Sequence, residues 1–148
     1  MSVRAATLAD LPRLAQLGLR MHAESPRFRR LRFNADRLAA LLARAVDHPE
    51  MLLLVGELGG EVAGGFLGLV SQHWCSDDIV ATDLALFIDR ERRGGILAPR
   101  LLREYVRWAE ARGAVLITAG VTTGIQTEMA ERLYEAIGMT RCGALFEV

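Results

Sequence analysis

The most informative stretch of the sequence is Ile88-Asp-Arg-Glu-Arg-Arg93-Gly94-Gly95-Ile96-Leu97-Ala98-Pro99-Arg100, in which an apolar segment runs through an Arg/Gly turn into a helical pattern. Two adjacent glycines allow a tight turn with unobstructed backbone N–H groups. A helix that begins directly after them points the positive end of its dipole at the same place. The stretch therefore predicts a site for a phosphate or pyrophosphate group, although Arg/Gly turns between a strand and a helix also occur without one.

Two familiar phosphate-binding motifs are absent from the chain. The sequence contains no G-x-x-x-x-G-K-[ST] segment and no G-x-G-x-x-G segment. These absences exclude, by signature, a P-loop kinase and a dinucleotide-binding fold.

The composition is typical of one folded domain that acts on small partners. The 148 residues are 51% hydrophobic, so we expect a single domain over residues 1–148 with a core that needs no disulfide or metal. The 18 basic residues, all arginine, balance 18 acidic ones, and a net charge of zero argues against a nucleic-acid or anionic-membrane surface. No apolar run is long enough to span a membrane.

Cysteine usage points to a reducing compartment, and the spacing of cysteines and histidines argues against a metal site. Cys75 and Cys142 are too few and too far apart for a disulfide framework, and no C-x-x-C segment occurs. The three histidines are also dispersed along the chain. We therefore expect a cytoplasmic protein and assign no metal site.

The first half of the chain predicts a strand, two helices and a hairpin. A short strand over residues 2–6 precedes a helix from Leu11 through Met21, and Asn34 can cap a second helix that stops near Pro49. Apolar segments over residues 51–58 and 61–70 flank Gly59-Gly60, which predicts a β-hairpin.

The second half predicts three strands and two helices. A strand over residues 79–88 would place Leu84, Leu86 and Ile88 on one face and Asp83, Ala85 and Phe87 on the other. A helix over residues 98–112, a strand over 115–119, a helix from Thr127 to the stop at Gly138 and a last strand over 142–148 follow. The order β-α-α-β-β-β-α-β-α-β predicts an α+β domain in which helices flank a mixed, mostly antiparallel sheet.

Two local motifs stand within this order of elements. The first is Ile88-x-x-x-x-Arg93-Gly94 followed by an amphipathic helix, and the second is Ala130-x-x-Leu133-Tyr134-x-x-x-Gly138-Met139. Together with the order of elements they resemble the GNAT superfamily of acyl-CoA-dependent N-acetyltransferases. The resemblance covers essentially the whole chain and implies a GNAT-like fold that uses acetyl-CoA as a co-substrate.

The resemblance assigns candidate cofactor-binding residues position by position. It implies that the strand carrying Leu86, Phe87 and Ile88 pairs its backbone with the pantetheine arm. It implies that backbone N–H groups hold the pyrophosphate, and these belong to Arg93, Gly94, Gly95, Ile96, Leu97 and Ala98. Thr127 stands where the family often has an asparagine and is a further candidate for a cofactor contact. The turn departs from the family pattern R-x-x-G-x-G/A, because Ile96 occupies its fourth position.

Three residues are candidates for catalysis. The resemblance places Tyr134 near the CoA sulfur, as a general acid for the departing thiolate. Asp83 lies in an apolar strand, where a carboxylate is costly unless it is paired, so we weigh it as the base or amine-orienting group against an ion pair with an arginine. Glu24, between the first two helices, is the second candidate for the base, against a solvated loop residue.

The expected reaction is transfer of an acetyl group to an amine of a small molecule or peptide. Direct transfer in a ternary complex is preferred, because neither cysteine lies in a motif that activates a nucleophile. The alternative is a non-catalytic CoA-binding or interaction module that retains the fold, and the Ile96 departure favours it. The resemblance and the apolar final segment, residues 144–148, also suggest a homodimer.

Overall fold

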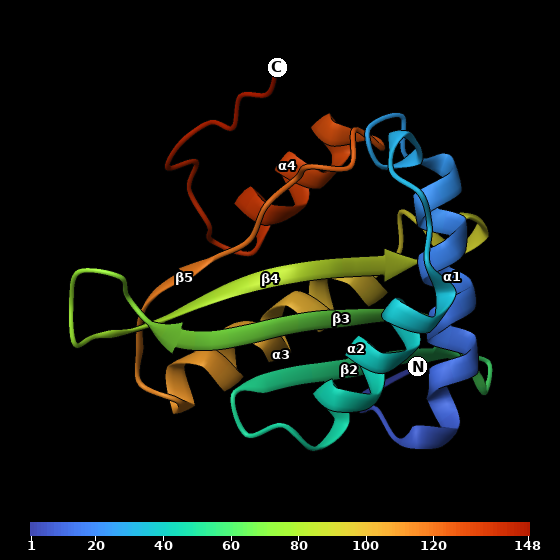
Figure 1. Cartoon of the computed structure of the whole chain (residues 1–148), viewed down its shortest axis with the longest axis horizontal. Coiled ribbons are helices and arrows are strands. Elements are labelled where there is room, and N and C mark those ends of the chain that lie inside the picture. The colour runs from blue at the N-terminus through green and yellow to red at the C-terminus, as the bar shows by residue number, and fades with distance from the viewer.

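The computed structural model describes all 148 residues, and a five-stranded sheet forms its middle layer (Figure 1). The strands lie side by side in chain order, and they are β1 (Ser2–Ala5), β2 (Met51–Leu58), β3 (Glu61–Gln72), β4 (Ile79–Ile88) and β5 (Ala114–Thr118). Neighbouring strands are antiparallel except β4 and β5, which are parallel. The mixed, mostly antiparallel sheet expected from the sequence is confirmed.

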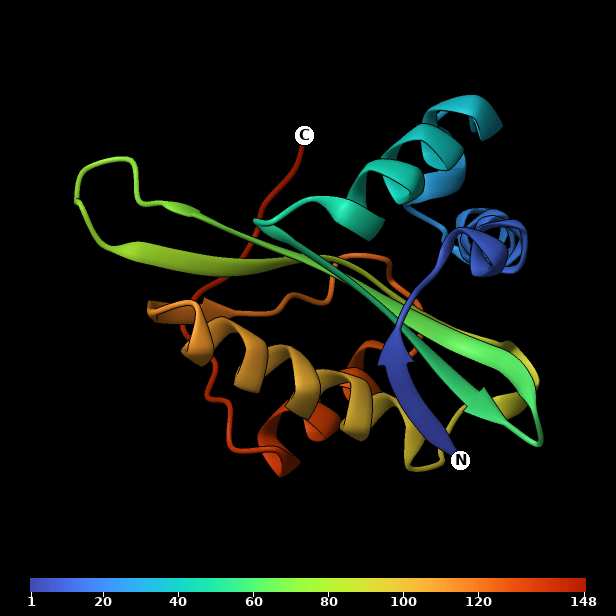
Figure 2. The ribbon, with the colours of Figure 1, turned by 90° about the horizontal axis from the view of Figure 1, so that it is seen from below.

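Helices cover both faces of this sheet, as the view in Figure 2 shows. The helices α1 (Leu11–Glu24) and α2 (Ala35–Asp47) lie on one face, whereas α3 (Leu97–Ala111) and α4 (Thr127–Ala136) lie on the side of the other. Short 3-10 turns at Leu8–Asp10, Phe28–Arg30 and Arg90–Arg92 stand upstream of α1, α2 and α3. The expected α+β class is therefore confirmed. No helix combines the length and the apolar character needed to cross a membrane.

Two hydrophobic cores join the three layers. Leu14 of α1, Leu42 of α2 and Phe87 of β4 belong to the core on the α1/α2 side. Phe66 of β3 and Tyr105 of α3 belong to the core on the α3 side, where their ring centroids lie 4.6 Å apart. Each fully buried large side chain contributes about 2 kcal/mol to stability. Because successive side chains of a strand point to opposite faces of the sheet, the same strands contribute to both cores and hold both helix layers.

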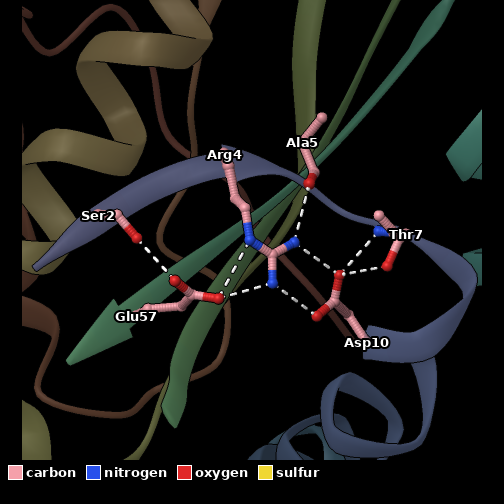
Figure 3. Close-up of polar contacts among 6 residues, drawn as sticks. All are labelled: Ser2, Arg4, Ala5, Thr7, Asp10 and Glu57. Atoms are coloured by element: carbon pink, nitrogen blue, oxygen red, sulfur yellow. Dashed lines mark hydrogen bonds and ion pairs between the residues drawn. The ribbon is translucent and has the colours of Figure 1, made fainter. Parts of the chain in front are cut away.

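A polar network fastens the first strand to the start of α1 (Figure 3). The Arg4 guanidinium donates to both carboxylate oxygens of Asp10, at 2.8 and 2.9 Å, and to Glu57 Oε1 at 2.6 Å. Asp10 also accepts from the Thr7 backbone N–H at 2.7 Å, and Ser2 Oγ donates to Glu57. Because Asp10 is only 8% exposed, its charge depends on these donors, and they hold the pKa of its carboxyl far below the ordinary value.

One β-bulge changes which side chains of β4 face each helix layer. Leu67 of β3 pairs with Ala85, and the next residue, Gly68, pairs with Asp83, so Leu84 is an extra residue. Beyond this bulge, Leu86 packs on the α3 side and Phe87 on the α1/α2 side. The expectation that Asp83 shares a face with Ala85 and Phe87 is therefore wrong, because the bulge resets the alternation and leaves Asp83 on the α3 side with Leu86.

The strands β4 and β5 run together over only part of their length. Their pairing extends from Ile79 opposite Ala114 to Thr82 opposite Thr118. From Asp83 to its end at Ile88, β4 pairs with β3 on one edge and with no strand on the other. The open edge provides one wall of the cleft described below.

The expected last strand over residues 142–148 is not formed. Residues 137–148 contain no helix or strand, and Leu145 and Phe146 are 69% and 89% exposed. Glu147 of this segment forms ion pairs with Arg27 at 2.7 Å and with Arg30 at 3.2 Å. An apolar segment forms a strand only where it hydrogen-bonds to the edge of another strand, and this segment pairs with no strand of the sheet.

Candidate functional site

A cleft of about 350 Å³ opens beside the free edge of β4. Its walls come from the second half of β4, the turn at residues 92–95, the first residues of α3, the loop over residues 120–126 and the inner face of α4. The end of α1 and the 3-10 turn after it add Met21 and Phe28. The cleft therefore lies where the two predicted motifs converge.

The Arg/Gly turn leaves its backbone donors free at one part of this cleft. Gly94 has a φ of 82°, a left-handed conformation that glycine adopts without strain. A Cβ added at Gly94 or Gly95 would meet nothing within 4 Å, so both positions border open space. No backbone N–H of residues 94–98 donates a hydrogen bond to the protein, and Ile96 supplies no side-chain cap to α3. This cradle of unpaired donors at a helix N-terminus fits a phosphate group.

The side chain of Arg93 ties the turn to α1 rather than pointing away as a free charge. Its two terminal nitrogens donate to Glu24 Oε1 and Oε2 at 2.6 and 2.7 Å, and its Nε donates to the carbonyl of Ile88 at 3.2 Å. The bidentate bond from Arg93 lowers the pKa of the Glu24 carboxyl, against a smaller opposing effect of burial. Glu24 does not line the cleft, and both its oxygens are engaged by Arg93.

Asp83 and Tyr134 are brought together by a single peptide unit of the β5–α4 loop. The backbone N–H of Gly120 donates to Asp83 Oδ1 at 3.0 Å, and the Tyr134 hydroxyl donates to the carbonyl oxygen of Gly120 at 2.9 Å. Both side chains line the cleft. The structure thus unites, through Gly120, the two leading catalytic candidates, one from β4 and one from α4.

The electrostatics of this pair follow from burial without a counter-charge. Asp83 makes no ion pair with any arginine. Desolvation raises the pKa of its carboxyl above the ordinary value, and the Gly120 N–H opposes that shift. Burial, and then the nearby Asp83 charge, raises the pKa of Tyr134. Tyr134 therefore remains protonated at neutral pH and is available as a proton donor.

The other predicted cofactor residues divide into two groups. Leu86, Ile88 and Ala98 line the cleft. The side chains of the remaining predicted residues do not line the cleft. Phe87 and Leu97 are buried in the two cores, at 3% and 1% exposure. Ile96 is 61% exposed and Thr127 is also exposed, and both lie outside the cleft lining. Any contact from Phe87, Ile96 or Leu97 to a cofactor would therefore come from the backbone.

Several residues that line the cleft were not predicted from the sequence. They are Met21, Phe28, Met129, Arg132 and the loop over residues 120–126. Within that loop Gln126 has a φ of 47°, and it is the one non-glycine residue with positive φ in the chain. A Thr-Thr-Gly-Ile-Gln segment between a strand and a helix was the available signal, since such loops at strand ends often carry binding residues.

The loop is fastened to the segment that follows α1. Ser25 Oγ donates to the carbonyl of Thr123 at 2.5 Å, and Arg27 donates to the carbonyl of Thr122 at 3.2 Å. Ser25 is completely buried. These bonds connect α1, the β5–α4 loop and, through Glu24 and Arg93, the turn before α3 into one rim around the cleft.

Comparisons with known proteins agree with this geometry. The model of the Acetyltransferase (GNAT) family matches residues 18–139. No curated protein sequence matches the chain. A mutant of the BH1408 protein from Bacillus halodurans has a similar structure, with a TM-score of 0.84 at 20% identity over 100% of this chain and 98% of that one.

Two further solved structures are also similar. One is a putative acetyltransferase from Agrobacterium tumefaciens, with a TM-score of 0.78 at 17% identity over 100% and 99% of the two chains. The other is an aminoglycoside acetyltransferase from an uncultured soil metagenomic sample in complex with sisomicin, with a TM-score of 0.72 at 15% identity over 99% and 93%. At these identities the structures share the fold, whereas the family model covers most of the chain. The chain belongs to the GNAT family of acetyltransferases.

Proposed function

We propose that the chain transfers an acetyl group from acetyl-CoA directly to an amine of its acceptor, within a ternary complex. The observation that carries this proposal is the single cleft that contains both the unpaired amides of the α3 turn and the Asp83–Gly120–Tyr134 arrangement. An anion site and an acid/base pair are the two requirements of acyl transfer from a phosphorylated thioester donor.

Acetyl-CoA would be held along the free edge of β4 and the turn before α3. Backbone N–H groups of residues 94–98 are the donors for its pyrophosphate, with the α3 dipole behind them. The unpaired edge of β4 from Asp83 to Ile88 offers backbone groups to the amide-bearing pantetheine arm. The bound donor supplies the activated acetyl thioester, and the chain supplies position and proton transfer.

The proton inventory assigns one role to each of two side chains. The acceptor nitrogen forms a bond to the acetyl carbon while the bond from that carbon to sulfur breaks. The leaving sulfur requires a proton, which the protonated Tyr134 hydroxyl supplies. The acceptor nitrogen loses a proton to Asp83, whose raised pKa makes it a better base than an ordinary carboxylate. Glu24 is less suited to this role, because Arg93 lowers its pKa and occupies both oxygens.

Direct transfer is favoured over an acetylated enzyme by the positions of the two thiols. Cys75 and Cys142 are both exposed, and neither lines the cleft. A covalent intermediate would need a nucleophile at the cleft with a base beside it. The cleft offers no thiol, so the acceptor amine itself is the nucleophile in the proposed reaction.

The non-catalytic alternative loses its main support at Ile96. That residue replaces the glycine of the family turn, but its side chain is 61% exposed and does not line the cleft. A bulky residue that points to solvent does not obstruct the backbone donors. We therefore expect the chain both to bind acetyl-CoA and to catalyse acetyl transfer.

Calorimetry with acetyl-CoA and CoA, and with ATP and NAD as controls, tests the binding half. Binding of the CoA species alone is expected, and Gly94→Val should weaken it because valine is strained at a φ of 82°. Product formation by Tyr134→Phe then tests the chemical half: loss of the proton donor should lower kcat by about 100-fold while CoA affinity stays nearly constant. Unchanged turnover in Tyr134→Phe would remove its role as the acid.

A further inference from the structure

The charges that line the cleft are few and unbalanced. Asp83 is its one carboxylate, against the guanidinium groups of Arg92, Arg93 and Arg132. Arg93 is already neutralised by Glu24, which stands outside the lining. A cation that enters the cleft therefore finds one negative group, and a second cation finds none.

Apart from the arginines, the rest of the lining offers a second ammonium group no carboxylate, only neutral groups. Met21, Phe28, Ile125 and Met129 present apolar side chains. The carbonyl oxygens of Thr122 and Thr123 already accept hydrogen bonds from Arg27 and Ser25. An ammonium group buried among these residues would lose water without gaining an anionic partner, and such a loss is costly.

From this inventory we infer that the acceptor is a primary amine with one positive charge on a largely apolar body, rather than a polycationic amine. The inference rests on the proposed function and adds the acceptor class to it. Asp83 pairs with the single ammonium group, which releases one proton to solvent to become the neutral nucleophile, and Asp83 then accepts the proton that the nitrogen loses as it bonds to the acetyl carbon. Met21, Phe28 and Met129 pack against the apolar part, which fixes the nitrogen beside Asp83.

The inference separates this chain from a protein of the same fold. The structurally similar aminoglycoside acetyltransferase binds sisomicin, a compound with several amino groups. Fold does not determine acceptor chemistry, which depends on the residues of the site. With one carboxylate in its cleft, this chain is expected to reject such a compound.

The test compares two acceptors of equal length, hexylamine and 1,6-diaminohexane, with sisomicin as a third. Because both cysteines are exposed and would consume a thiol reagent, acetylated product is quantified by mass spectrometry. We expect kcat/KM for hexylamine to exceed that for the diamine by about 100-fold, since the second ammonium group has no partner. Sisomicin should be the poorest acceptor of the three.

A variant with a second carboxylate in the cleft tests whether the lack of such a group causes the preference for the monoamine. Gln126→Glu adds a second carboxylate to the lining with almost no change in shape, so the preference for hexylamine over the diamine should fall at least about tenfold. Gln16→Glu is the matched control, because Gln16 is exposed on α1 and does not line the cleft. Its preference should equal that of the unmodified chain.

The outcomes that contradict the inference are distinct from those that contradict the function. A diamine or sisomicin preference in the unmodified chain refutes the inference and leaves acetyl transfer in place. Acetylation of the diamine or sisomicin without acetylation of hexylamine also refutes it, whereas binding of acetyl-CoA with no acetylation of any of the three amines contradicts the inference and the proposed transfer together. Absence of acetyl-CoA binding in the calorimetric experiment refutes the proposed function itself, and the inference with it.

Discussion

Substitution of Glu24 by glutamine separates a structural role of this residue from a catalytic one. Glu24 and Arg93 form a bidentate ion pair between the end of α1 and the turn that precedes α3. We expect the pair to hold the turn in the conformation that exposes its backbone donors. Loss of the carboxylate should then weaken acetyl-CoA binding and leave the chemical step unchanged.

The size of the effect follows from the exposure of the pair. Charge-assisted hydrogen bonds contribute about 1.5–3 kcal/mol when they are sheltered from water. The side chains of Arg93 and Glu24 are 18% and 26% exposed, so solvent screens part of this energy, and one amide oxygen of glutamine still accepts from Arg93. About 1 kcal/mol of stability should be lost. If the same energy orders the turn for binding, the Kd of acetyl-CoA rises about fivefold.

Three measurements on Glu24→Gln check this reasoning. Urea unfolding gives the free energy of unfolding, calorimetry gives the Kd of acetyl-CoA, and steady-state kinetics with a working acceptor gives kcat and KM. Glu110→Gln is the control, because Glu110 is exposed on α3 and forms no ion pair. A loss of kcat of more than about 100-fold at unchanged acetyl-CoA affinity would show that Glu24 is the general base and that its ion pair with Arg93 does not order the turn for binding.

Three further predictions concern Asp83, Asp10 and Gly56. Because burial raises the pKa of Asp83, kcat/KM should rise with pH through a pKa above the ordinary aspartate value. This rise should be absent in Asp83→Asn. If the variant still shows the rise, another residue is the base. The pKa of Asp10 is lowered in the folded state, so the charged Asp10 stabilises the fold at pH values above its unfolded-state pKa, and this stabilisation is lost as the pH falls. Asp10→Asn should therefore lower the free energy of unfolding by about 2 kcal/mol at pH 7 and by progressively less in acid, which chemical unfolding at each pH measures. A Cβ at Gly56 would overlap the Leu97 side chain, so Gly56→Ala should destabilise the chain by about 1–3 kcal/mol and weaken acetyl-CoA binding, whereas Gly143→Ala, with open space around it, should do neither.

The turn before α3 could be predicted from the sequence because its chemistry is local. Two glycines, the start of an amphipathic helix and a preceding apolar strand lie within thirteen consecutive residues, and each is an independent signal of the same structure. The hairpin around Gly59 and Gly60 was predictable for the same reason, since both residues adopt positive φ, at 59° and 80°. Backbone conformation that is demanded by residue type can be recognised without tertiary contacts.

Features that depend on distant partners could not be predicted in this way. Glu24 and Arg93 are 69 positions apart, and nothing in either local sequence indicates that they meet. The final segment has the apolar composition of a strand, yet Glu147 pairs with Arg27 and Arg30 and no strand forms. Strand formation requires a partner edge, and composition carries no information about which edges are free.

The bulge at Leu84 shows how one such feature decides the chemistry. Strict alternation would have placed Asp83 with Phe87 in the α1/α2 core, where Phe87 is 3% exposed and an unpaired carboxylate would be strongly destabilising. One extra residue shifts the strand by half a period, and Asp83 instead reaches the cleft and the Gly120 N–H. The carboxylate within an apolar strand was therefore evidence against unbroken alternation, since only an interruption allows Asp83 and Phe87 to be satisfied in the same strand.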